Sequence, residues 1–164
     1  MVPTILDNQT YKNVKIKLCI APCGKLKVWD RYPNAGPTKA EDVYIGPFAR
    51  TCIEYAKKFY KDSYVILSDK YGFLFPDEVI PENYDVTFKD PKTNPISVED
   101  LRRQVIEKGL INYNEIEVIG GKTYVDIAKQ VFKGKRIITP LQGLGGIGRM
   151  ISAMKSAISR GWIR

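Results

Sequence analysis

The sequence predicts an α/β protein in which a mainly parallel sheet of four or more strands lies between two layers of helices. Short apolar, β-prone segments alternate along the chain with longer segments whose apolar residues recur at helical spacing. Each short segment ends in glycine or in polar residues, as expected of parallel strands that finish at one edge. We expect residues 1–164 to form a single domain, with 1–13 as an N-terminal extension.

The first half of the chain contains two predicted strands and one predicted helix. Residues 14–21 are apolar and β-prone, so they form the first strand. Residues 28–37 are rich in Trp, Tyr, Pro, Asn and Gly, which predicts a long loop. Residues 48–60 carry apolar side chains at helical spacing and are expected to form an amphipathic helix. Residues 64–68 form a continuous apolar run, which is typical of a strand buried on both faces.

A long segment, residues 73–96, separates the two halves. It contains four prolines and little periodicity. Connections of this length in a small domain are usually functional or mobile, so we expect a functional or mobile loop.

The second half repeats the alternation of helix and strand. Ser97 is a predicted N-cap of a helix that runs to about Lys108, where Gly109 ends it. The remaining elements are a strand over 115–119, a helix over 124–132, a strand over 136–139 and a last helix over about 149–159. With right-handed crossovers, these elements make a three-layer α/β/α sandwich of the Rossmann-like kind.

Composition narrows the range of possible partners and reactions. The net charge is +8 and the pI about 9.3. This surplus of positive charge favours a nucleic acid or nucleotide as partner, and the alternative is a solvated, lysine-rich surface without such a partner. The chain has no histidine, which excludes Ser-His-Asp and Cys-His catalysis. Three scattered cysteines without histidine predict neither a disulfide framework nor a zinc site, and we expect no metal and no cofactor.

Hydropathy predicts a cytoplasmic protein that has no contact with a membrane. The longest apolar runs are far shorter than the roughly 18 residues that span a bilayer. Residues 1–10 also lack the basic and then apolar layout of a signal peptide. The oligomeric state is left open.

Candidate site residues follow each predicted strand at its carboxyl end, where ligands bind in open α/β sheets. Three strands contribute the following residues: Cys23, Gly24, Lys25 and Lys27 after the first, Ser68, Asp69, Lys70, Tyr71 and Gly72 after the second, and Gly121 after the third. Because parallel strands end at one edge, we expect these residues and Gly143 to surround one cleft.

Each of these residues has a functional interpretation beside a structural one. Cys23 beside lysines is either a nucleophile with a lowered pKa or, as we favour, a small buried residue. Lys25 and Lys27 are candidate anion contacts. Lys70 is a candidate catalytic residue or phosphate clamp, and Tyr71 can stack on a base.

A glycine-rich segment follows the fourth strand and leads into the last helix. Its candidate binding residues are Gln142, Gly143, Gly145, Gly146, Gly148 and Arg149. Glycines there let the backbone approach a ligand, and a helix N-terminus presents free N–H groups to an anion. The segment matches neither a Walker loop nor the dinucleotide-binding fingerprint, so a phosphate or sugar cradle and a tight structural turn both remain open.

The long segment also carries acidic residues that can serve catalysis. Asp77, Glu78, Glu82 and Asp85 lie close together in the sequence. A carboxylate held over a nucleoside can orient a water or stabilise a developing cation, whereas the alternative is a solvated acidic loop. Asp85 and Glu78 are the preferred catalytic candidates.

Several motifs in a fixed order make the chain resemble a family of small α/β domains, the DUF6884 type. The motifs are Cys23-Gly24-Lys25-Leu26-Lys27, Tyr44-Ile45-Gly46-Pro47-Phe48, Leu67-Ser68-Asp69-Lys70-Tyr71-Gly72-Phe73, Asp77-Glu78-Val79-Ile80 with Tyr84-Asp85, and 140–148. The resemblance covers the chain from about Lys15 onward. This chain departs from the family pattern by an extra glycine at 145–146 and by Asp69 in place of alanine, so no catalytic role is carried over to Asp69.

A more distant resemblance points toward nucleobase chemistry. The Ser68, Tyr71, Gly72 and Tyr84-Asp85 pattern is similar to that of the lyase-type domain of archaeosine-forming tRNA enzymes. Such domains are similar to the uracil-DNA glycosylase fold, which is an analogy at the level of the fold alone. The histidine on which those glycosylases rely is missing here, so excision of ordinary uracil is not expected.

The leading hypothesis is therefore an enzyme that processes a nucleobase in nucleic acid, at or near an N-glycosidic bond. Phosphate would rest on the glycine-rich segment and Lys25, Tyr71 would stack on the base, and Asp85 or Glu78 would serve the reaction. In a duplex, such chemistry usually requires an extruded base. The alternatives are an enzyme acting on free nucleotides or nucleotide sugars, and a non-catalytic nucleic-acid-binding module.

Overall fold

The computed structural model describes residues 16–161, which form a five-stranded sheet between two layers of helices. The strands lie in the order β4-β3-β1-β6-β7. Their bounds are β1 (Lys17–Pro22), β3 (Tyr64–Ser68), β4 (Gly72–Leu74), β6 (Glu115–Val118) and β7 (Arg136–Ile138). All neighbours pair in parallel except β4, which runs antiparallel to β3 at one edge. The predicted three-layer α/β/α class is confirmed.

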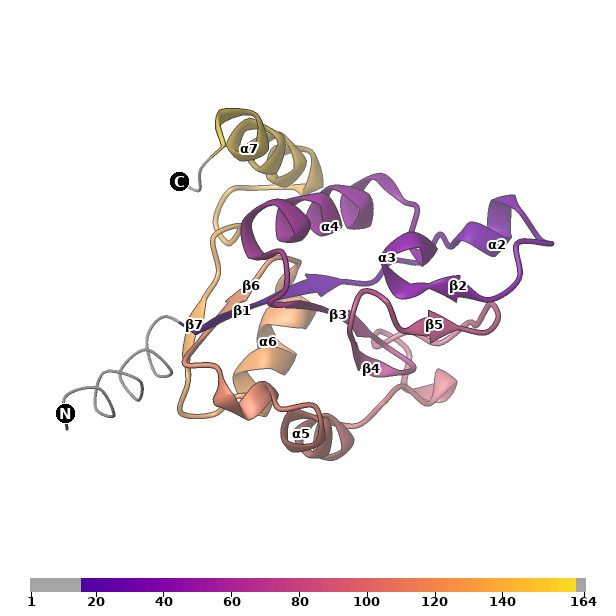
Figure 1. The fold of residues 1–164 in the computed structure, drawn as a ribbon, viewed down its shortest axis with the longest axis horizontal. Helices are drawn as coiled ribbons and strands as arrows, with labels where there is room; N and C mark the ends of the chain where they lie inside the picture. Colours follow the sequence, from indigo (N-terminus) through magenta and orange to yellow (C-terminus); the bar gives the residue numbers. More distant parts are fainter. Residues whose placement is uncertain (1–15, 162–164) are drawn as a thin grey trace, which may run out of the picture.

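Two helices cover each face of the sheet (Figure 1). Helices α4 (Pro47–Tyr60) and α7 (Ile147–Arg160) lie on one face, and α5 (Val98–Glu107) and α6 (Lys122–Val131) lie on the other. Both faces of β1 are buried beyond the exposed Lys17, which explains the apolar run over residues 18–21. Cys19 and Ala21 pack toward α4 and α7, whereas Leu18 and Ile20 pack toward α5 and α6.

Local sequence signals explain where the helices begin. Pro47 occupies the first turn of α4, where its missing N–H costs nothing. The Ser97 side chain accepts a hydrogen bond from the Asp100 backbone N–H at 3.0 Å, as predicted for the N-cap of α5. Helices α6 and α7 each begin two residues earlier than predicted, directly after Gly121 and Gly146.

Two loop predictions are wrong in part, because the segments 28–37 and 73–96 both contain short regular elements. The first begins with a short helix, α2 (Val28–Arg31), and the second contains β4, β5 (Val79–Ile80) and a 3-10 turn over Pro91–Thr93. Strand β5 pairs antiparallel with β2 (Thr38–Lys39), which leads into helix α3 (Ala40–Val43). Pairing between two-residue strands from distant segments leaves no periodic signal in the sequence.

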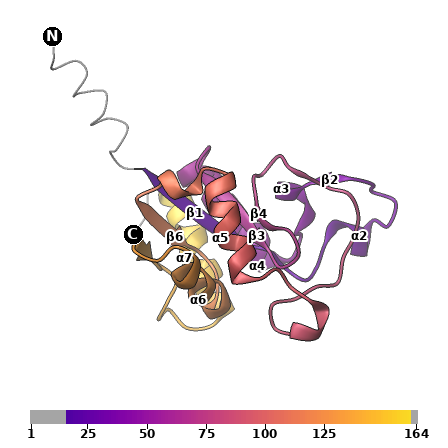
Figure 2. The ribbon, with the colours of Figure 1, turned by 90° about the horizontal axis from the view of Figure 1, so that it is seen from below.

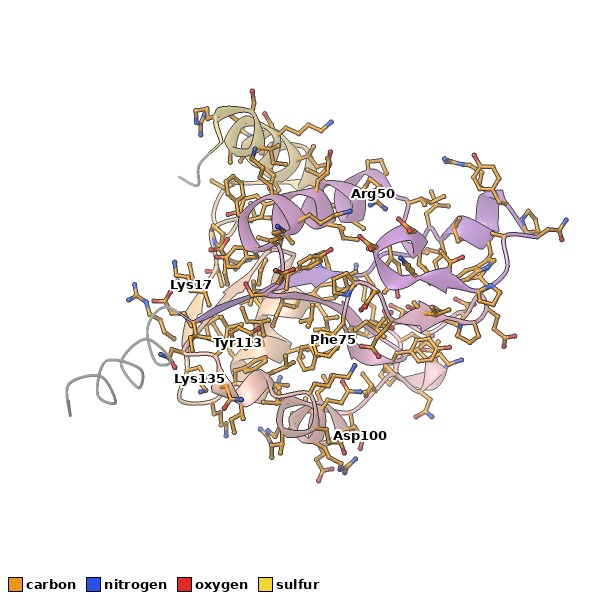
Figure 3. All side chains as sticks on the ribbon, viewed as in Figure 1. Lys17, Arg50, Phe75, Asp100, Tyr113 and Lys135 are labelled. Atoms are coloured by element: carbon orange, nitrogen blue, oxygen red, sulfur yellow. The ribbon has the colours of Figure 1, made fainter. Side chains whose placement is uncertain are left out.

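These short elements form a lobe beyond the carboxyl ends of β1 and β3. Figure 1 and Figure 2 both place α2, α3 and β2 to one side of the sheet and away from α5 and α6. Arg50 of α4 ties the lobe to the sandwich, since its Nη1 donates to the carbonyls of Glu41 and Tyr44 at 3.1 and 3.2 Å (Figure 3). Within residues 16–161, no helix is long and apolar enough to cross a membrane.

Gly72 is expected to be intolerant of a side chain. Its φ is +79°, and an added Cβ would lie 2.2 Å from Oε1 of Gln104, which accepts the Phe73 N–H. Gly72→Ala should lower the free energy of unfolding by about 2–4 kcal/mol through backbone strain and the displaced hydrogen bonds. Denaturant unfolding measures this loss.

Gly36→Ala is the matched control for this substitution. Gly36 has a φ of +74°, but an added Cβ meets nothing within 4 Å. It should therefore show the backbone strain alone, about 1–2 kcal/mol. Equal losses at the two positions would contradict the role assigned to Gln104.

Candidate functional site

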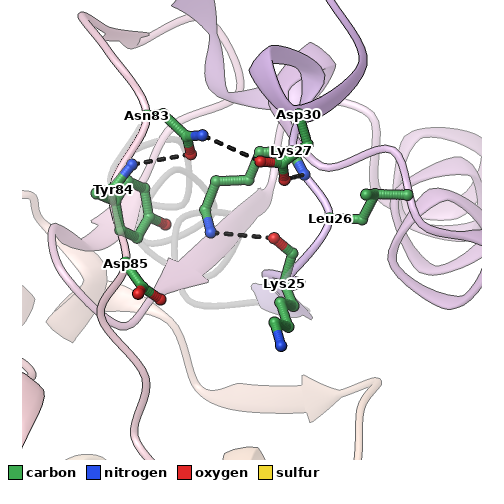
Figure 4. A pocket seen from close by; sticks show the side chains of 7 residues that line it. All are labelled: Lys25, Leu26, Lys27, Asp30, Asn83, Tyr84 and Asp85. Atoms are coloured by element: carbon green, nitrogen blue, oxygen red, sulfur yellow. Dashed lines mark hydrogen bonds between the residues drawn. The ribbon is translucent and has the colours of Figure 1, made fainter.

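A cavity of about 790 Å³ lies between the segment that follows β1 and the segment that follows β5 (Figure 4). Its size is within the range of small-molecule sites in proteins. Its lining residues are Lys25, Leu26, Lys27, Asp30, Asn83, Tyr84 and Asp85. Two of the predicted binding residues, Lys25 and Lys27, and one predicted catalytic residue, Asp85, thus share one cavity.

Asp30 fixes the two walls of the cavity relative to each other. Its Oδ2 accepts from the Lys27 backbone N–H at 2.8 Å, and its Oδ1 accepts from Nδ2 of Asn83 at 3.1 Å. These two donors, the Lys27 N–H first, lower the pKa of Asp30 below its ordinary value. Asp30 is therefore a charged structural link between the segments.

Lys27 is a buried cation in the wall of this cavity. Its side chain extends between Tyr84 and Lys25 (Figure 4), and the residue is only 5% exposed. Its Nζ donates to the Lys25 carbonyl at 3.3 Å and lies 4.3 Å from the centroid of the Tyr84 ring. The ring face attracts the ammonium by a cation–π interaction.

A polar network beneath the cavity holds Tyr84 in place. The Tyr84 hydroxyl lies 2.5 Å from the Tyr44 hydroxyl and 3.0 Å from Ser68 Oγ. Ser68 Oγ also accepts from the backbone N–H groups of Lys70 and Tyr71, at 3.1 and 3.0 Å. Burial raises the pKa of Tyr84, so its phenol stays protonated and neutral under ordinary conditions.

Lys70 and Tyr71 lie beside the cavity and contact its aromatic wall. The Tyr71 and Tyr84 rings meet edge to face at 5.5 Å between centroids. The Lys70 ammonium lies 5.3 Å from the Tyr71 centroid and 5.8 Å from the Tyr84 centroid. The network of Ser68 thus positions two of the predicted residues at the edge of the cavity.

Cys23 belongs to a buried cluster beyond the ends of β3, β1 and β6. Its thiol donates to Asp69 Oδ1 at 3.0 Å and lies 3.2 Å from the Tyr124 hydroxyl. Burial, and then the charge of Asp69, raise the pKa of Cys23 well above its ordinary value. The thiol therefore stays protonated, which supports the structural interpretation of Cys23 over the nucleophilic one.

The glycines among the candidate residues differ in how closely their surroundings pack. A Cβ on Gly24 would lie 3.2 Å from the Ala49 Cβ, so the first strand's exit passes close to α4. Gly121 precedes α6, and an added Cβ there meets nothing within 4 Å. Gly72, the remaining glycine of this set, opens the antiparallel strand β4.

The two preferred carboxylates are placed very differently. Asp85 is exposed and lines the cavity opposite Lys25 (Figure 4). Glu78 Oε1 accepts from Lys108 Nζ at 2.6 Å and from the Phe75 N–H at 2.7 Å, and Glu78 does not line the cavity. Of these two candidates, Asp85 is therefore the carboxylate that a ligand in the cavity can reach.

The glycine-rich segment does not join this cavity. It follows β7, the edge strand that β6 separates from β1. Leu144 helps to line a second cavity of about 230 Å³, bordered by Tyr55 of α4 and Met154 of α7. The candidate residues of this segment, Gln142, Gly143, Gly145, Gly146, Gly148 and Arg149, are all exposed.

The expectation of one common cleft therefore holds only in part. Lys25 and Lys27 line the cavity, and Lys70 and Tyr71 contact its aromatic wall. Cys23, Gly121 and Gly143 do not line it. Parallel strands do end at one edge, yet that edge is as wide as the sheet. The order of the strands in the sheet cannot be predicted from the sequence alone. The position of β7 at the edge farthest from β3 was therefore not predicted.

Sequence reasoning also missed residues that the structure brings to the site. Asn83 and Tyr84 lie after a two-residue strand, and Asp30 lies in a four-residue helix, so neither segment had a recognisable element to place it. Tyr124, which contacts Cys23, had a usable signal. It follows the carboxyl end of a parallel strand, the position at which open α/β sheets carry their sites.

The site contains no evident metal centre. Among residues 16–161, no group of three or more His, Cys, Asp or Glu side chains is arranged to hold a metal ion. The chemistry available in the cavity is that of the lysine ammonium groups, the Tyr84 ring, the Asn83 amide and the carboxylates of Asp30 and Asp85.

Comparisons with known proteins place the chain in a family. It is 45% identical over 143 residues to the uncharacterized protein YfjM of Bacillus subtilis (strain 168), a match that covers 87% of this chain and 95% of that protein. No solved structure matches the chain. The model of a family of unknown function, DUF6884, matches residues 23–156, which include every residue of the cavity. The chain therefore belongs to the DUF6884 family.

Proposed function

We propose that this protein processes a nucleobase in nucleic acid, acting at or near an N-glycosidic bond in the cavity between the segments after β1 and β5. The observation that carries the proposal is the juxtaposition of Asp85 on one wall with Lys25 and Lys27 on the other. The two lysine ammonium groups can bind a phosphate, and the exposed Asp85 carboxylate can stabilise a sugar carbon that becomes positively charged.

The chemistry of the bond explains why such a pair is useful. Breaking an N-glycosidic bond develops positive charge on the sugar, and a carboxylate stabilises that charge or orients the attacking water. Asp85 supplies this group without a histidine. Lys25 contacts the phosphate, and the Tyr71 ring at the cavity edge offers a stacking surface for the base.

A second candidate function is an enzyme acting on free nucleotides or nucleotide sugars. The cavity volume of about 790 Å³ favours it, since this lies within the range of small-molecule sites. A purely electrostatic binding module is less well supported, because surface charge alone needs neither a cavity nor a carboxylate within it.

The test is an assay of base release from modified oligonucleotides, nucleotides and nucleotide sugars. The wild type should release a base, and Asp85→Asn should lose turnover by about 100-fold or more while keeping affinity, because the amide retains shape but not charge. Asp77→Asn is the matched control, since Asp77 is exposed and lines a different cavity.

The same assay separates the alternatives. Release only from free nucleotides or nucleotide sugars would replace the nucleic-acid substrate by the smaller one. Absence of release from any substrate would defeat the proposed chemistry. An equal loss in Asp85→Asn and Asp77→Asn would remove Asp85 from the mechanism.

A further inference from the structure

We propose that Lys27 is the phosphate-binding group of this cavity, and that its ammonium is retained there at the expense of folding stability. The inference deepens the proposed function and rests on it only for the choice of nucleotides as ligands. The phosphate belongs either to a free nucleotide or to a nucleic acid.

The first argument is the absence of a counter-ion. Lys27 is 5% exposed, yet none of the ion pairs found within residues 16–161 includes it. A lysine ammonium has three N–H donors. The only hydrogen bond of Nζ in the described part of the chain goes to the Lys25 carbonyl, at 3.3 Å. Two donors are therefore free for a ligand.

The second argument is that the surroundings of the Lys27 ammonium do not fully offset the free-energy cost of burying its charge. A buried charge is unfavourable unless it is paired and hydrogen-bonded. The Tyr84 ring offsets part of this cost from 4.3 Å. The charge of Asp30 offsets a further part, but Asp30 makes no ion pair with the ammonium, and its oxygens accept from Lys27 N and Asn83 Nδ2. An apolar side chain of similar length would fill the same space without this cost.

The third argument is where the ammonium lies. Lys27 lines the cavity itself rather than a closed part of the core, and the exposed Lys25 lines the same wall. Lys70 adds a third ammonium, 5.8 Å from the same Tyr84 ring. No ion pair within residues 16–161 includes Lys25 or Lys70 either.

Two ammonium groups near the Tyr84 ring, those of Lys27 and Lys70, together with Lys25 on the cavity wall, suit a phosphate better than a singly charged carboxylate. A phosphate offers several strong acceptor oxygens and up to two charges, and lysine binds it as a point charge. The free N–H groups of Lys27 and the exposed charge of Lys25 can contact different oxygens. The neighbouring space is large enough for the rest of a nucleotide.

The experiment compares 5′-mononucleotides with the corresponding nucleosides by calorimetry, in the wild type, Lys27→Met and Lys129→Met. Lys129 is an exposed residue of α6 outside the cavity and serves as the control. In the wild type and the control, the nucleotides should bind about 10- to 100-fold more tightly than the nucleosides. In Lys27→Met this ratio should fall by about 10-fold, because Lys25 alone remains in the cavity wall.

Thermal unfolding supplies the second readout. Lys27→Met should melt at the same temperature as the wild type or higher, because it replaces an unpaired buried charge by an apolar side chain. Inorganic phosphate should raise the melting temperature of the wild type and not that of Lys27→Met. Arms with 5′-phosphorylated oligonucleotides, and with oligonucleotides that have only internal phosphates, identify which phosphate is bound.

Two results would overturn the inference. One is a nucleotide-to-nucleoside ratio that is the same in Lys27→Met and the wild type. The other is a Lys27→Met variant that melts lower or does not fold, since Lys27 would then be structural. Failure of the proposed function gives a different result. If the nucleotide-to-nucleoside ratio falls in Lys27→Met but no substrate releases a base, the phosphate site is supported and only the glycosidic chemistry is contradicted.

Discussion

The protein is expected to unfold cooperatively when the pH is raised from about 10 to 12. The cause is a set of tyrosines whose pKa values burial raises, including Tyr44, Tyr55, Tyr60 and Tyr84. Tyr44 is fully buried, and its hydroxyl has only neutral partners there. The folded state therefore keeps these phenols protonated.

The sign of the effect follows from proton linkage. In the unfolded chain a tyrosine loses its proton near pH 10, whereas in the folded state these tyrosines keep it at higher pH. Above that pH the unfolded state binds fewer protons, so stability falls as the pH rises. Each such tyrosine lowers the free energy of unfolding by at most about 1.4 kcal/mol per pH unit.

Parallel titrations by ultraviolet absorbance and circular dichroism check this expectation. Tyrosinate absorbance from the buried tyrosines should rise together with the loss of secondary structure. Tyr44→Phe should flatten the dependence of stability on pH, whereas Tyr32→Phe should not, because Tyr32 is 60% exposed. Complete tyrosine ionisation that precedes unfolding would contradict the expectation.

The sandwich was predictable from sequence because its signals are local. Strands such as 64–68 are short continuous apolar runs, and helices such as α4 repeat apolar residues on one face. The lobe was not predictable in this way. Strands β2 and β5 are each two residues long and pair across about 40 residues of chain, so nothing local marks either one.

The candidate site was likewise predictable only where its signals are local. Lys25 and Lys27 were chosen because they follow the first strand closely, and both line the cavity. Asp85 was found as an acidic residue on the long segment, but the sequence did not distinguish it from Glu78. The distinction is a matter of tertiary contacts, because Lys108 of a distant segment pairs with Glu78 and leaves Asp85 free to line the cavity.

Glu117 gives the second large effect, because it is a buried carboxylate held by two phenols. It is 4% exposed on β6 and faces α4. Its Oε2 accepts from the Tyr55 hydroxyl at 2.7 Å and its Oε1 from the Tyr60 hydroxyl at 2.5 Å. No ion pair within residues 16–161 includes Glu117, so the two phenols are its principal compensation.

The double variant Tyr55→Phe/Tyr60→Phe should therefore lose about 3–5 kcal/mol of stability at neutral pH, because it leaves a buried charge without donors. Each single variant should lose about 1.5–3 kcal/mol, the usual value of a hydrogen bond to a charged group. Denaturant unfolding of the three variants measures these losses. Replacing Glu117 by Leu in the double variant should recover most of the stability, because it removes the charge that lacks a partner.

The Leu substitution separates this explanation from simple loss of packing. Tyr55→Phe and Tyr60→Phe keep each ring and remove only its hydroxyl, so a loss that came from packing would persist after Glu117 is replaced by Leu. If the phenols act by holding the carboxylate, the stability lost in the double variant disappears once the carboxylate is gone. No recovery with Leu at position 117 would mean that the phenols contribute by packing rather than by holding the carboxylate.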